Sequence, residues 1–288
     1  MNYRELQQTL KTLRLEGLTT IKLNQKGTIL QAEYDRIQGI QGIQEQPQRP
    51  ITGDLTFGVE IEILNTIDRH EIARALEAEG INAASEFYNH RTTTWWKVIT
   101  DSSCGLEVVS PILSGEQGLN ELKTVCEVLT RIGCQVDKQC GVHVHIGANA
   151  LGVSKVKSVV KRWLSNESNL DTIQPRSRRG TNNEYCLPLA NTIRTHLIDN
   201  CFTLEDLANI QSTRYSKLNL RSYLTHRTIE FRHHAGSTDA TKITNWVKFL
   251  LDFCTTATPE TATATEFGNL FANNNIAQFY RQRQLQLA

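Results

Sequence analysis

Residues 57–64 read Phe-Gly-Val-Glu-Ile-Glu-Ile-Leu, and this stretch constrains the fold more than any other. Alternation with a period of two places Glu60 and Glu62 on one face of a β-strand and β-branched residues on the other. The apolar face predicts the buried side of a sheet. Two adjacent carboxylates repel each other unless a proton or a cation compensates them. Taken alone, the stretch favours a strand with solvated glutamates over a divalent-cation site built from oxygen ligands.

The composition narrows the class of protein. The chain has 288 residues, and its 31 basic and 30 acidic residues nearly cancel, so no overall field attracts nucleic acid. The seven cysteines are scattered without a Cys-x-x-Cys pair, which indicates reduced thiols. The N-terminus lacks the apolar core of a signal peptide, and no apolar run approaches the roughly 20 residues of a membrane helix. We therefore expect a cytoplasmic protein that does not contact membranes.

The first 52 residues predict a small module followed by a linker. Residues 1–37 show a helix, an extended piece and a second helix, a pattern that resembles small SAP-like modules. Four basic side chains would be able to contact nucleic-acid phosphates: Lys11, Arg14, Lys22 and Lys26. A docking hairpin with a solvated basic face is the favoured interpretation, with weak nucleic-acid or protein contact as the alternative. Residues 38–52 are rich in Gln, Gly and Pro and predict a flexible linker.

Residues 53–254 are predicted to form the main domain. Strand candidates alternate with helical patterns, such as the amphipathic stretches 116–132 and 239–254. We expect an α+β domain in which helices cover the outer face of an antiparallel sheet. Residues 255–265 are rich in Thr and Ala, so residues 255–288 are interpreted as a low-complexity linker and a C-terminal tail.

Polar residues recur with a period of two in separate strand candidates of this domain. They are Glu60 and Glu62, Asp101 with Glu107 beyond it, His143 and His145, and Glu230 and Arg232. One such pair is usually an exposed polar face, but strands in one sheet would bring all of these groups to one surface. Carboxylates with imidazole suit two or more Mg²⁺ or Mn²⁺ ions, and an added arginine suits phosphoryl transfer from ATP. The sequence contains no P-loop, Rossmann or serine-hydrolase motif.

The order of these motifs resembles a known family. The segments are FGVEIE, Asp101 followed by EVVSP, CGVHVHIG, RYSKLNL, and TIEFRHHAGSTDATKITNWVKFL. Together they span about residues 55–254 and resemble the predicted amidoligases, which belong to the carboxylate–amine ligase superfamily of glutamine synthetase and γ-glutamylcysteine synthetase. The resemblance implies a glutamine synthetase-like open funnel as the active site. It also implies ATP-dependent joining of a carboxylate to an amine through an acyl phosphate.

The resemblance implies two sets of metal ligands. The set for an ion that bridges the ATP phosphates is Glu60, His143 and Glu230, and the set for an ion near the substrate carboxylate is Glu62, Asp101 and Glu107. Either Asp101 or Glu107 would also be able to accept a proton from the attacking amine. The expected cofactors are thus ATP and two or more Mg²⁺ or Mn²⁺ ions.

Basic residues are assigned to the nucleotide by the same resemblance. Arg232 would reach the transferred phosphoryl group, and His145 would lie near the nucleotide phosphates. Arg178 or Arg179, in a basic loop before a Tyr-Cys pair, would bind phosphate or the acceptor carboxylate. The substrates would be a small-molecule or peptide carboxylate and an amine donor, in a peptide, protein or cell-wall-type modification.

Two other functions use the same residues. The carboxylates could activate water in a Mg²⁺-dependent phosphohydrolase or nuclease, or the scaffold could bind nucleotide or DNA without catalysis. The Glu230-x-Arg232 strand and the ordered motifs favour the ligase. Cys104, Cys140 and Cys186 lie near the motifs, and we expect them to be small buried hydrophobes rather than catalytic thiols.

Overall fold

The computed structural model describes residues 3–15, 21–31, 33–34 and 55–288. The chain divides into two compact units, Met1–Gln48 and Arg49–Ala288. In the first unit, helix α1 spans Tyr3–Leu15, residues 27–31 and 33–34 are helical, and Leu6, Leu10 and Leu30 form a small apolar cluster. The SAP-like interpretation of residues 1–37 stays a prediction. The predicted linker, residues 38–52, lies outside the described residues.

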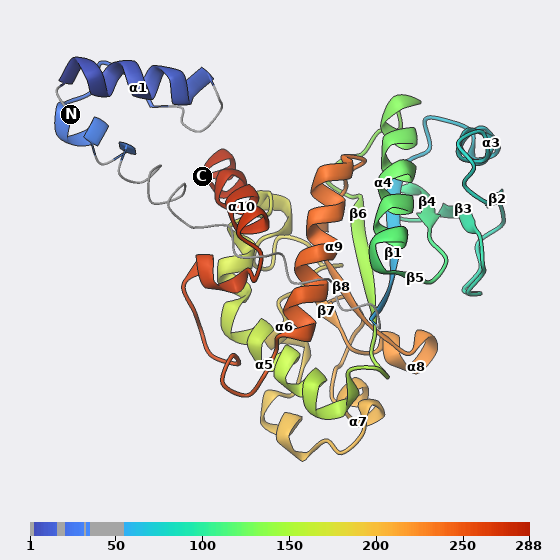
Figure 1. Cartoon of the computed structure of the whole chain (residues 1–288). Helices are drawn as coiled ribbons and strands as arrows, with labels where there is room; N and C mark the ends of the chain where they lie inside the picture. The colour runs from blue at the N-terminus through green and yellow to red at the C-terminus, as the bar shows by residue number, and fades with distance from the viewer. Residues whose placement is uncertain (1–2, 16–20, 32, 35–54) are drawn as a thin grey trace. The chain divides into compact units, whose positions relative to one another are not determined.

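The second unit is built on one mostly antiparallel sheet (Figure 1), which confirms the predicted α+β class. Its strands are β1 (Thr56–Leu64), β2 (Ala83–Ser85), β3 (Trp96–Asp101), β4 (Gly105–Val109), β5 (Leu113–Ser114), β6 (Gly141–Gly147), β7 (Leu218–Asn219) and β8 (Thr228–Ala235). The order across the sheet is β2-β3-β4-β1-β6-β8-β7, with β5 also paired to β1. Only the β2–β3 pair is parallel among the described strands. Strand β1, the acidic strand of the sequence, therefore lies in the middle of the sheet.

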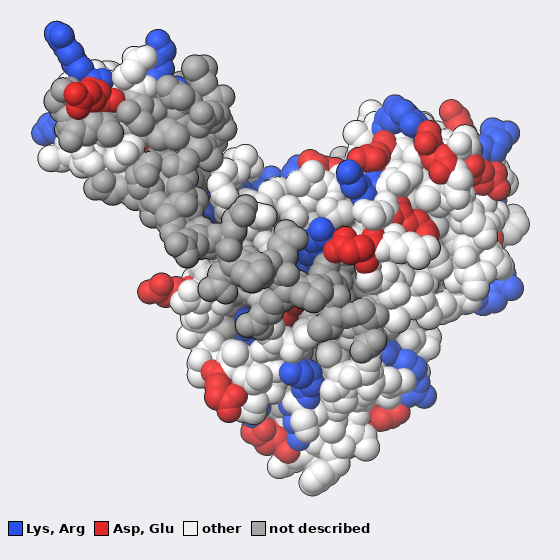
Figure 2. Space-filling view, viewed as in Figure 1, with Lys and Arg blue, Asp and Glu red and all other residues white. Residues whose placement is uncertain are grey.

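Helices cover the apolar face of the sheet. The longer ones are α3 (Arg69–Glu77), α4 (Gly115–Arg131), α5 (Gly152–Asp171), α9 (Ala240–Thr255) and α10 (Asn274–Leu287), and shorter turns are α6 (Leu189–Thr192), α7 (Leu204–Asn209), α8 (Ser222–His226), η1 (Arg176–Arg178), η2 (Thr195–Asn200) and η3 (Phe267–Leu270). Helices α4 and α9 lie side by side against the central strands (Figure 1), and basic and acidic side chains are interspersed over this helical face (Figure 2). Within the described ranges, no helix combines the length and apolarity needed to cross a bilayer.

Side-chain alternation explains how the sheet acquires two different faces. Val59, Ile61 and Ile63 of β1 are at most 1% exposed and pack with residues of α4 and α9 in one large core. Burial of each such side chain contributes about 1.5–3 kcal/mol. Asp239 fixes the start of α9, because its carboxylate accepts a hydrogen bond from the Lys242 backbone N–H. The glutamates of β1 are thereby held on the opposite face.

The C-terminal segment differs from the sequence expectation of a linker and tail. Residues 255–288 belong to the same compact unit as the sheet. The side chain of Asn166 in α5 pairs with the backbone of Thr263 and Thr265 at 3.0 Å each, so the low-complexity stretch is anchored. Beyond it, the rings of Phe271 and Tyr280 stack 5.3 Å apart within the core. Backbone groups satisfied by buried amides, rather than apolar periodicity, hold this stretch in place.

A buried ionic network supports β7 and β8 from the helical side. Nζ of Lys217, which is fully buried, lies 2.6 Å from Oδ1 of Asp171, and Nε2 of His233 lies 2.8 Å from the same oxygen. The other Asp171 oxygen accepts the Gly180 backbone N–H at 2.7 Å. Burial alone would raise the pKa of Asp171, but the hydrogen bonds and charges of His233 and Lys217 outweigh it and lower the pKa to about 2. One carboxylate thus joins α5, β8, the residue before β7 and the loop after η1.

Replacement of Asp171 by Asn should lower the free energy of unfolding by roughly 3 kcal/mol at pH 7, because Lys217 is left buried without its closest partner. The wild-type contribution is complete above pH 5 and is lost as the pH falls from 3.8 toward 2. The difference between wild type and variant should shrink over that range in urea titrations. Asp199→Asn, which breaks an exposed pair with Lys161, is the matched control and should have little effect. Equal stability of Asp171→Asn and wild type at pH 7 would contradict this account.

Candidate functional site

The polar face of the sheet lines an open pocket of about 1960 Å³. The predicted site residues that line it are Glu60, Glu62, Asp101, Glu107, His143, His145, Arg178, Glu230 and Arg232. They come from five strands that the sheet order places next to one another, and from η1. The structure therefore brings together every predicted metal ligand, and the solvated-strand interpretation of residues 57–64 does not describe β1.

Strand register decides which of these side chains meet. Glu60 lies opposite His143 of β6, and Glu62 lies opposite Glu107 of β4. Across the next pair, His145 lies opposite Glu230 of β8. The β6–β8 register shifts between Val142 and Val144, so β8 carries an additional residue there. As a result the Arg232 guanidinium lies beside His143, with Nη1 3.4 Å from Nδ1.

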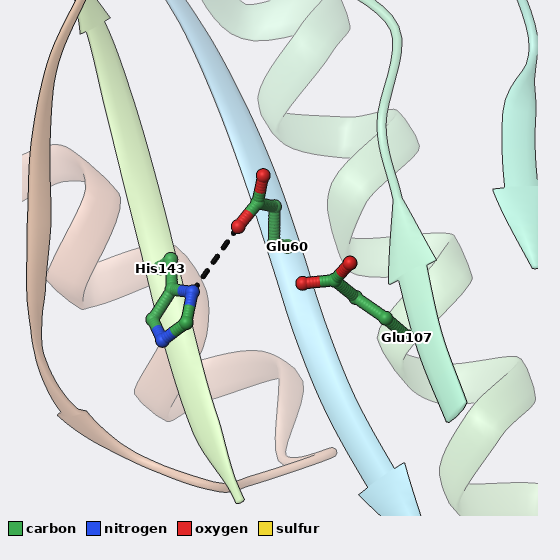
Figure 3. A group of neighbouring side chains, drawn as sticks. All are labelled: Glu60, Glu107 and His143. Atoms are coloured by element: carbon green, nitrogen blue, oxygen red, sulfur yellow. Dashed lines mark hydrogen bonds and ion pairs between the residues drawn. The ribbon is translucent and has the colours of Figure 1, made fainter. Parts of the chain in front are cut away.

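Glu60 is shared by two groups of possible metal ligands. In one, Nε2 of His145 lies 3.3 Å from Glu60 and 4.0 Å from Glu230. In the other, Nδ1 of His143 lies 3.1 Å from Glu60, and the Glu107 carboxylate points toward Glu60 from the neighbouring strand (Figure 3). In each group one ligand atom per residue lies within 4.8 Å of the others. This spacing suits a common cation.

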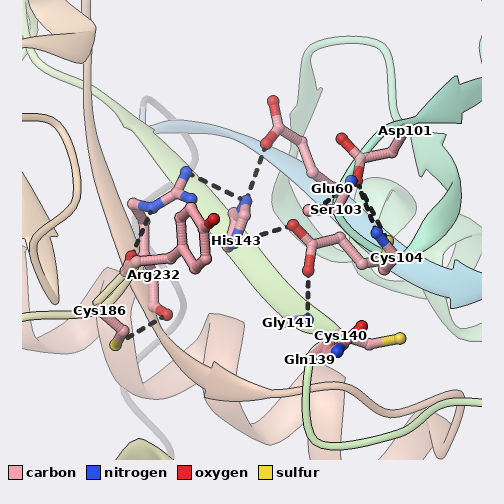
Figure 4. Close-up of polar contacts among 12 residues, drawn as sticks. Glu60, Asp101, Ser103, Cys104, Gln139, Cys140, Gly141, His143, Cys186 and Arg232 are labelled. Carbon is pink, nitrogen blue, oxygen red and sulfur yellow. Dashed lines mark hydrogen bonds and ion pairs between the residues drawn. The ribbon is translucent and has the colours of Figure 1, made fainter. Parts of the chain in front are cut away.

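A third group lies at the turn between β3 and β4. It consists of Glu62, Asp101 and Cys104. One oxygen of Asp101 accepts hydrogen bonds from the backbone of Ser103 and Cys104 (Figure 4). Glu62 accepts the Gly141 backbone N–H at 2.5 Å. The carboxylates are thus held by backbone donors and do not depend on one another for position.

These groupings differ in detail from the sets that the family resemblance implies. Glu60 does lie with Glu230, and Glu62 with Asp101. However, His145 groups with Glu60 and Glu230 where His143 was expected, and Glu107 groups with Glu60 and His143 where Glu62 and Asp101 were expected. Period two specifies the face of each side chain, whereas the pairing depends on register and rotamer.

The pKa values show an excess of negative charge on one side of the site. Burial, followed by the charges of Glu60, Glu62 and Asp101, raises the pKa of Glu107 well above its usual range. For Glu60, burial would raise the pKa, but His145 and His143 outweigh it and lower the pKa well below normal. The Glu107 side therefore lacks positive charge that a bound cation would supply.

The donor set fits a divalent cation that prefers oxygen and imidazole. Nε2 of His145 is buried and has no partner with hydrogen-bond geometry in the described part of the chain. Its other ring nitrogen lies 2.8 Å from Oγ1 of Thr228, which orients the imidazole. A histidine fixed through one nitrogen presents the lone pair of the other to a metal. Carboxylates with imidazole are typical ligands of Mg²⁺ and Mn²⁺ sites in phosphate chemistry.

The three arginines assigned from sequence have different environments. Arg232 faces the pocket, with Nη1 2.6 Å from Glu230. Burial alone would lower the pKa of Arg232, but the charge and hydrogen bond of Glu230 outweigh it and raise the pKa. Arg178 is 2% exposed, and its two terminal nitrogens donate to the backbone carbonyls of Gln139, Cys140 and Arg232.

Arg179 is absent from the lining of this pocket. It donates from Nε to the Gln174 carbonyl and from Nη2 to the Leu287 carbonyl at the end of α10. Both guanidinium groups connect backbone segments, and the nucleotide contacts expected for Arg178 and Arg179 stay predictions. Cys104, Cys140 and Cys186 are buried, as expected, and burial raises the pKa of Cys186.

Sequence reasoning missed several polar side chains of the site, among them one on β7 and one on β3. Asn219 of β7 donates to Glu230 at 2.6 Å and orients that carboxylate. Lys97 precedes Asp101 on β3, and the period-two alternation of the strand puts both on the same face. The Lys97 side chain is 3% exposed. Burial lowers the pKa of Lys97 despite nearby carboxylates. The period-two spacing from Asp101 could have predicted that Lys97 faces the site. The strand that contains Asn219 has only two residues, so no alternation pattern could have predicted its position.

Comparison with known proteins identifies a family over most of this unit. Residues 53–254 match the family model described as "Putative amidoligase enzyme". Among solved structures, a bifunctional glutathione synthetase from Pasteurella multocida is similar with a TM-score of 0.39 and 14% identity. The similarity covers 81% of this chain and 40% of that chain, so the chain spans less than half of its length. No curated protein matches the sequence.

Mn²⁺ should raise the melting temperature of the wild-type protein, because an ion that binds only the folded state stabilises it by about 3 kcal/mol at roughly a hundred times its Kd. Glu60→Gln removes the carboxylate shared by two groups and should reduce the shift to less than half. Glu116→Gln, at an exposed position in α4, is the control and should keep the full shift. Equal shifts in the two variants, measured by calorimetry with EDTA reversal, would exclude Glu60 as a ligand.

Proposed function

Because the chain belongs to the amidoligase family, we propose that it is an ATP-dependent carboxylate–amine ligase that forms an amide or isopeptide bond. The observation that carries the proposal is the crowding of Glu60, Glu62 and Glu107 beside Arg232 on the wall of an open pocket. Such a surface repels free carboxylates and phosphates unless cations bind first. It is suited to a substrate that arrives with Mg²⁺, as ATP does.

Each group of ligands has a distinct proposed role. Glu60 and Glu230, with His145 and His143, would hold the ion that contacts the ATP phosphates. Glu62 and Asp101, with Glu107, would hold a second ion near the substrate carboxylate. Bound Mg²⁺ supplies neutralisation of phosphate charge and polarisation of the attacked oxygens. The described contacts support this division, since Glu60 lies between the two sides.

Arg232 would stabilise the charge that develops during phosphoryl transfer. Its guanidinium is held by Glu230 at 2.6 Å, and its backbone N–H bonds to the Lys217 carbonyl at 2.9 Å. An oxygen of the substrate carboxylate would attack the γ-phosphorus, and ADP would leave. Because Glu230 holds it, the Arg232 guanidinium already has a fixed position before the equatorial oxygens of the phosphoryl group gain charge. A donor placed in advance is the condition for effective electrostatic catalysis.

The second step is attack of the amine on the acyl phosphate. The amine nitrogen bonds to the acyl carbon, inorganic phosphate leaves, and one proton must go to a base. Glu107 is the better proposed base of the two candidates, because burial and neighbouring carboxylates raise its pKa. For Asp101, burial would raise the pKa, but hydrogen bonds from Ser103 and Cys104 outweigh it and lower the pKa. A carboxylate with a raised pKa holds the amine proton more readily.

The open sheet with a polar concave face supports a glutamine synthetase-like funnel as the proposed site architecture. The pocket is open and has a volume of about 1960 Å³. A pocket of this size has room for a carboxylate carried on a peptide, protein or cell-wall-type substrate, whereas a small enclosed pocket would not. An amine donor would enter the same opening.

The purified protein with Mg²⁺, ATP and hydroxylamine as a trial amine should convert a carboxylate substrate to its hydroxamate, releasing ADP and phosphate in equal amounts. Arg232→Ala should lower turnover about a hundredfold or more, since one charge-stabilising donor is lost. Arg131→Ala, an arginine at an exposed position in α4 and outside the pocket lining, is the control and should keep wild-type turnover. Release of AMP and pyrophosphate would contradict the acyl-phosphate mechanism. Nucleic-acid cleavage without ATP would favour a hydrolase instead.

A further inference from the structure

A row of rings leads outward from the Glu60 cluster at one end of the pocket. The centroid of His145 lies 5.7 Å from that of His226, in a T-shaped contact, and His226 lies 6.3 Å from His90. Tyr88 follows, 5.0 Å from His90, and all four rings line the pocket. The row runs from His145, which is largely buried, to Tyr88, which is 52% exposed. Beyond His145, the proposed chemistry gives these rings no role.

The segment that carries Tyr88 and His90 is held in place by the missed lysine. Nζ of Lys97 donates to the Arg91 carbonyl at 2.6 Å and to the Asn89 side chain at 3.2 Å. Oη of Tyr88 lies 3.2 Å from Nε2 of His90. The buried Lys97 ammonium binds the backbone of this loop and keeps the rings of Tyr88 and His90 in one arrangement. Little conformational entropy is therefore lost when a ligand stacks on them.

Strand β8 shows where the row of rings lies relative to Arg232, the proposed site of phosphoryl transfer. Thr228, Glu230 and Arg232 follow with a period of two along the pocket face. Oγ1 of Thr228 lies 2.8 Å from His145, at the end where the ring row begins. Arg232 lies beside His143 at the other end. A nucleotide with its last phosphate at Arg232 and its phosphates along Glu230 would therefore extend toward the rings.

We propose that Tyr88, His90 and His226 form the base-binding wall for the nucleoside triphosphate. The inference rests on the proposed function and goes beyond it by assigning where the base lies. The three rings come from two segments, the loop that carries Tyr88 and His90 and helix α8 with His226. The row begins beside the possible metal ligands and ends in solvent. Aromatic stacking accepts any base, so this wall supplies affinity with little selection among nucleobases.

A second aromatic pair lies at the opposite end of the same strand face. The rings of Tyr185 and Tyr215 are 5.2 Å apart, and the Tyr185 carbonyl accepts a hydrogen bond from Arg232 at 3.4 Å. This pair lies next to the arginine proposed to bind the transferred phosphoryl group. The base of the same nucleotide is directed away from it. Tyr185 is 47% exposed, which makes it a matched control for Tyr88.

The test compares equilibrium binding of ATP and of inorganic tripolyphosphate, both with Mg²⁺, to the full chain. Tyr88→Ala and His226→Ala should each raise the Kd for ATP by about fivefold or more, the usual effect of losing one stacking ring. Neither should change the Kd for tripolyphosphate, which has no base and also reports that the site is still folded. Tyr185→Ala should leave both constants at their wild-type values.

Three results would overturn the base wall: unchanged ATP affinity in both Tyr88→Ala and His226→Ala, equal losses for ATP and tripolyphosphate, or a larger selective loss of ATP in Tyr185→Ala. Failure of the proposed function gives a different result from failure of the base wall. If Glu60→Gln weakens both ligands while the ring variants weaken neither, the ligase site stands and the base wall is wrong. If the wild-type protein binds neither ligand, both proposals are wrong.

Discussion

Repulsion among carboxylates on the polar face of a central sheet is the constraint on which this structure depends. Glu62 lies directly opposite Glu107, and Glu60 lies beside both. No apolar core could accept that face, so it must line a solvent-filled pocket, and the other face must supply the stability. Nearby donors compensate only part of the charge: imidazoles serve Glu60, a backbone N–H serves Glu62, and Glu107 keeps a raised pKa. A cation is the remaining way to relieve it.

The sequence predicted the face of each side chain but not its partner. Alternation in residues 57–64 and 140–147 specified which residues share the polar face, because the side-chain period of a strand is fixed. The register, and the shift between Val142 and Val144 that brings Arg232 to His143, depend on contacts between distant segments. The family resemblance supplied the ligand list, yet it could not show that His145 and Glu230 face each other.

Composition did not reveal the tertiary contacts of two segments. A basic loop suggested phosphate binding, but Arg178 and Arg179 bind backbone carbonyls, which only the fold reveals. The Thr- and Ala-rich stretch after residue 254 has little periodicity of its own, and Asn166 anchors it. In each case polar side chains satisfy buried backbone groups, an interaction that leaves no periodic signal in the sequence.

The most direct test of the central claim is the free energy of unfolding of Glu107→Gln, measured with and without Mn²⁺. Because the folded state raises the pKa of Glu107 above 4.5, the wild type loses stability as the pH rises past that value, and the neutral amide does not. The account predicts a variant more stable than wild type at pH 7 without metal, with the advantage vanishing below about pH 4 and reduced stabilisation by Mn²⁺. A variant that is less stable than wild type without metal, and fully stabilised by Mn²⁺, would contradict it.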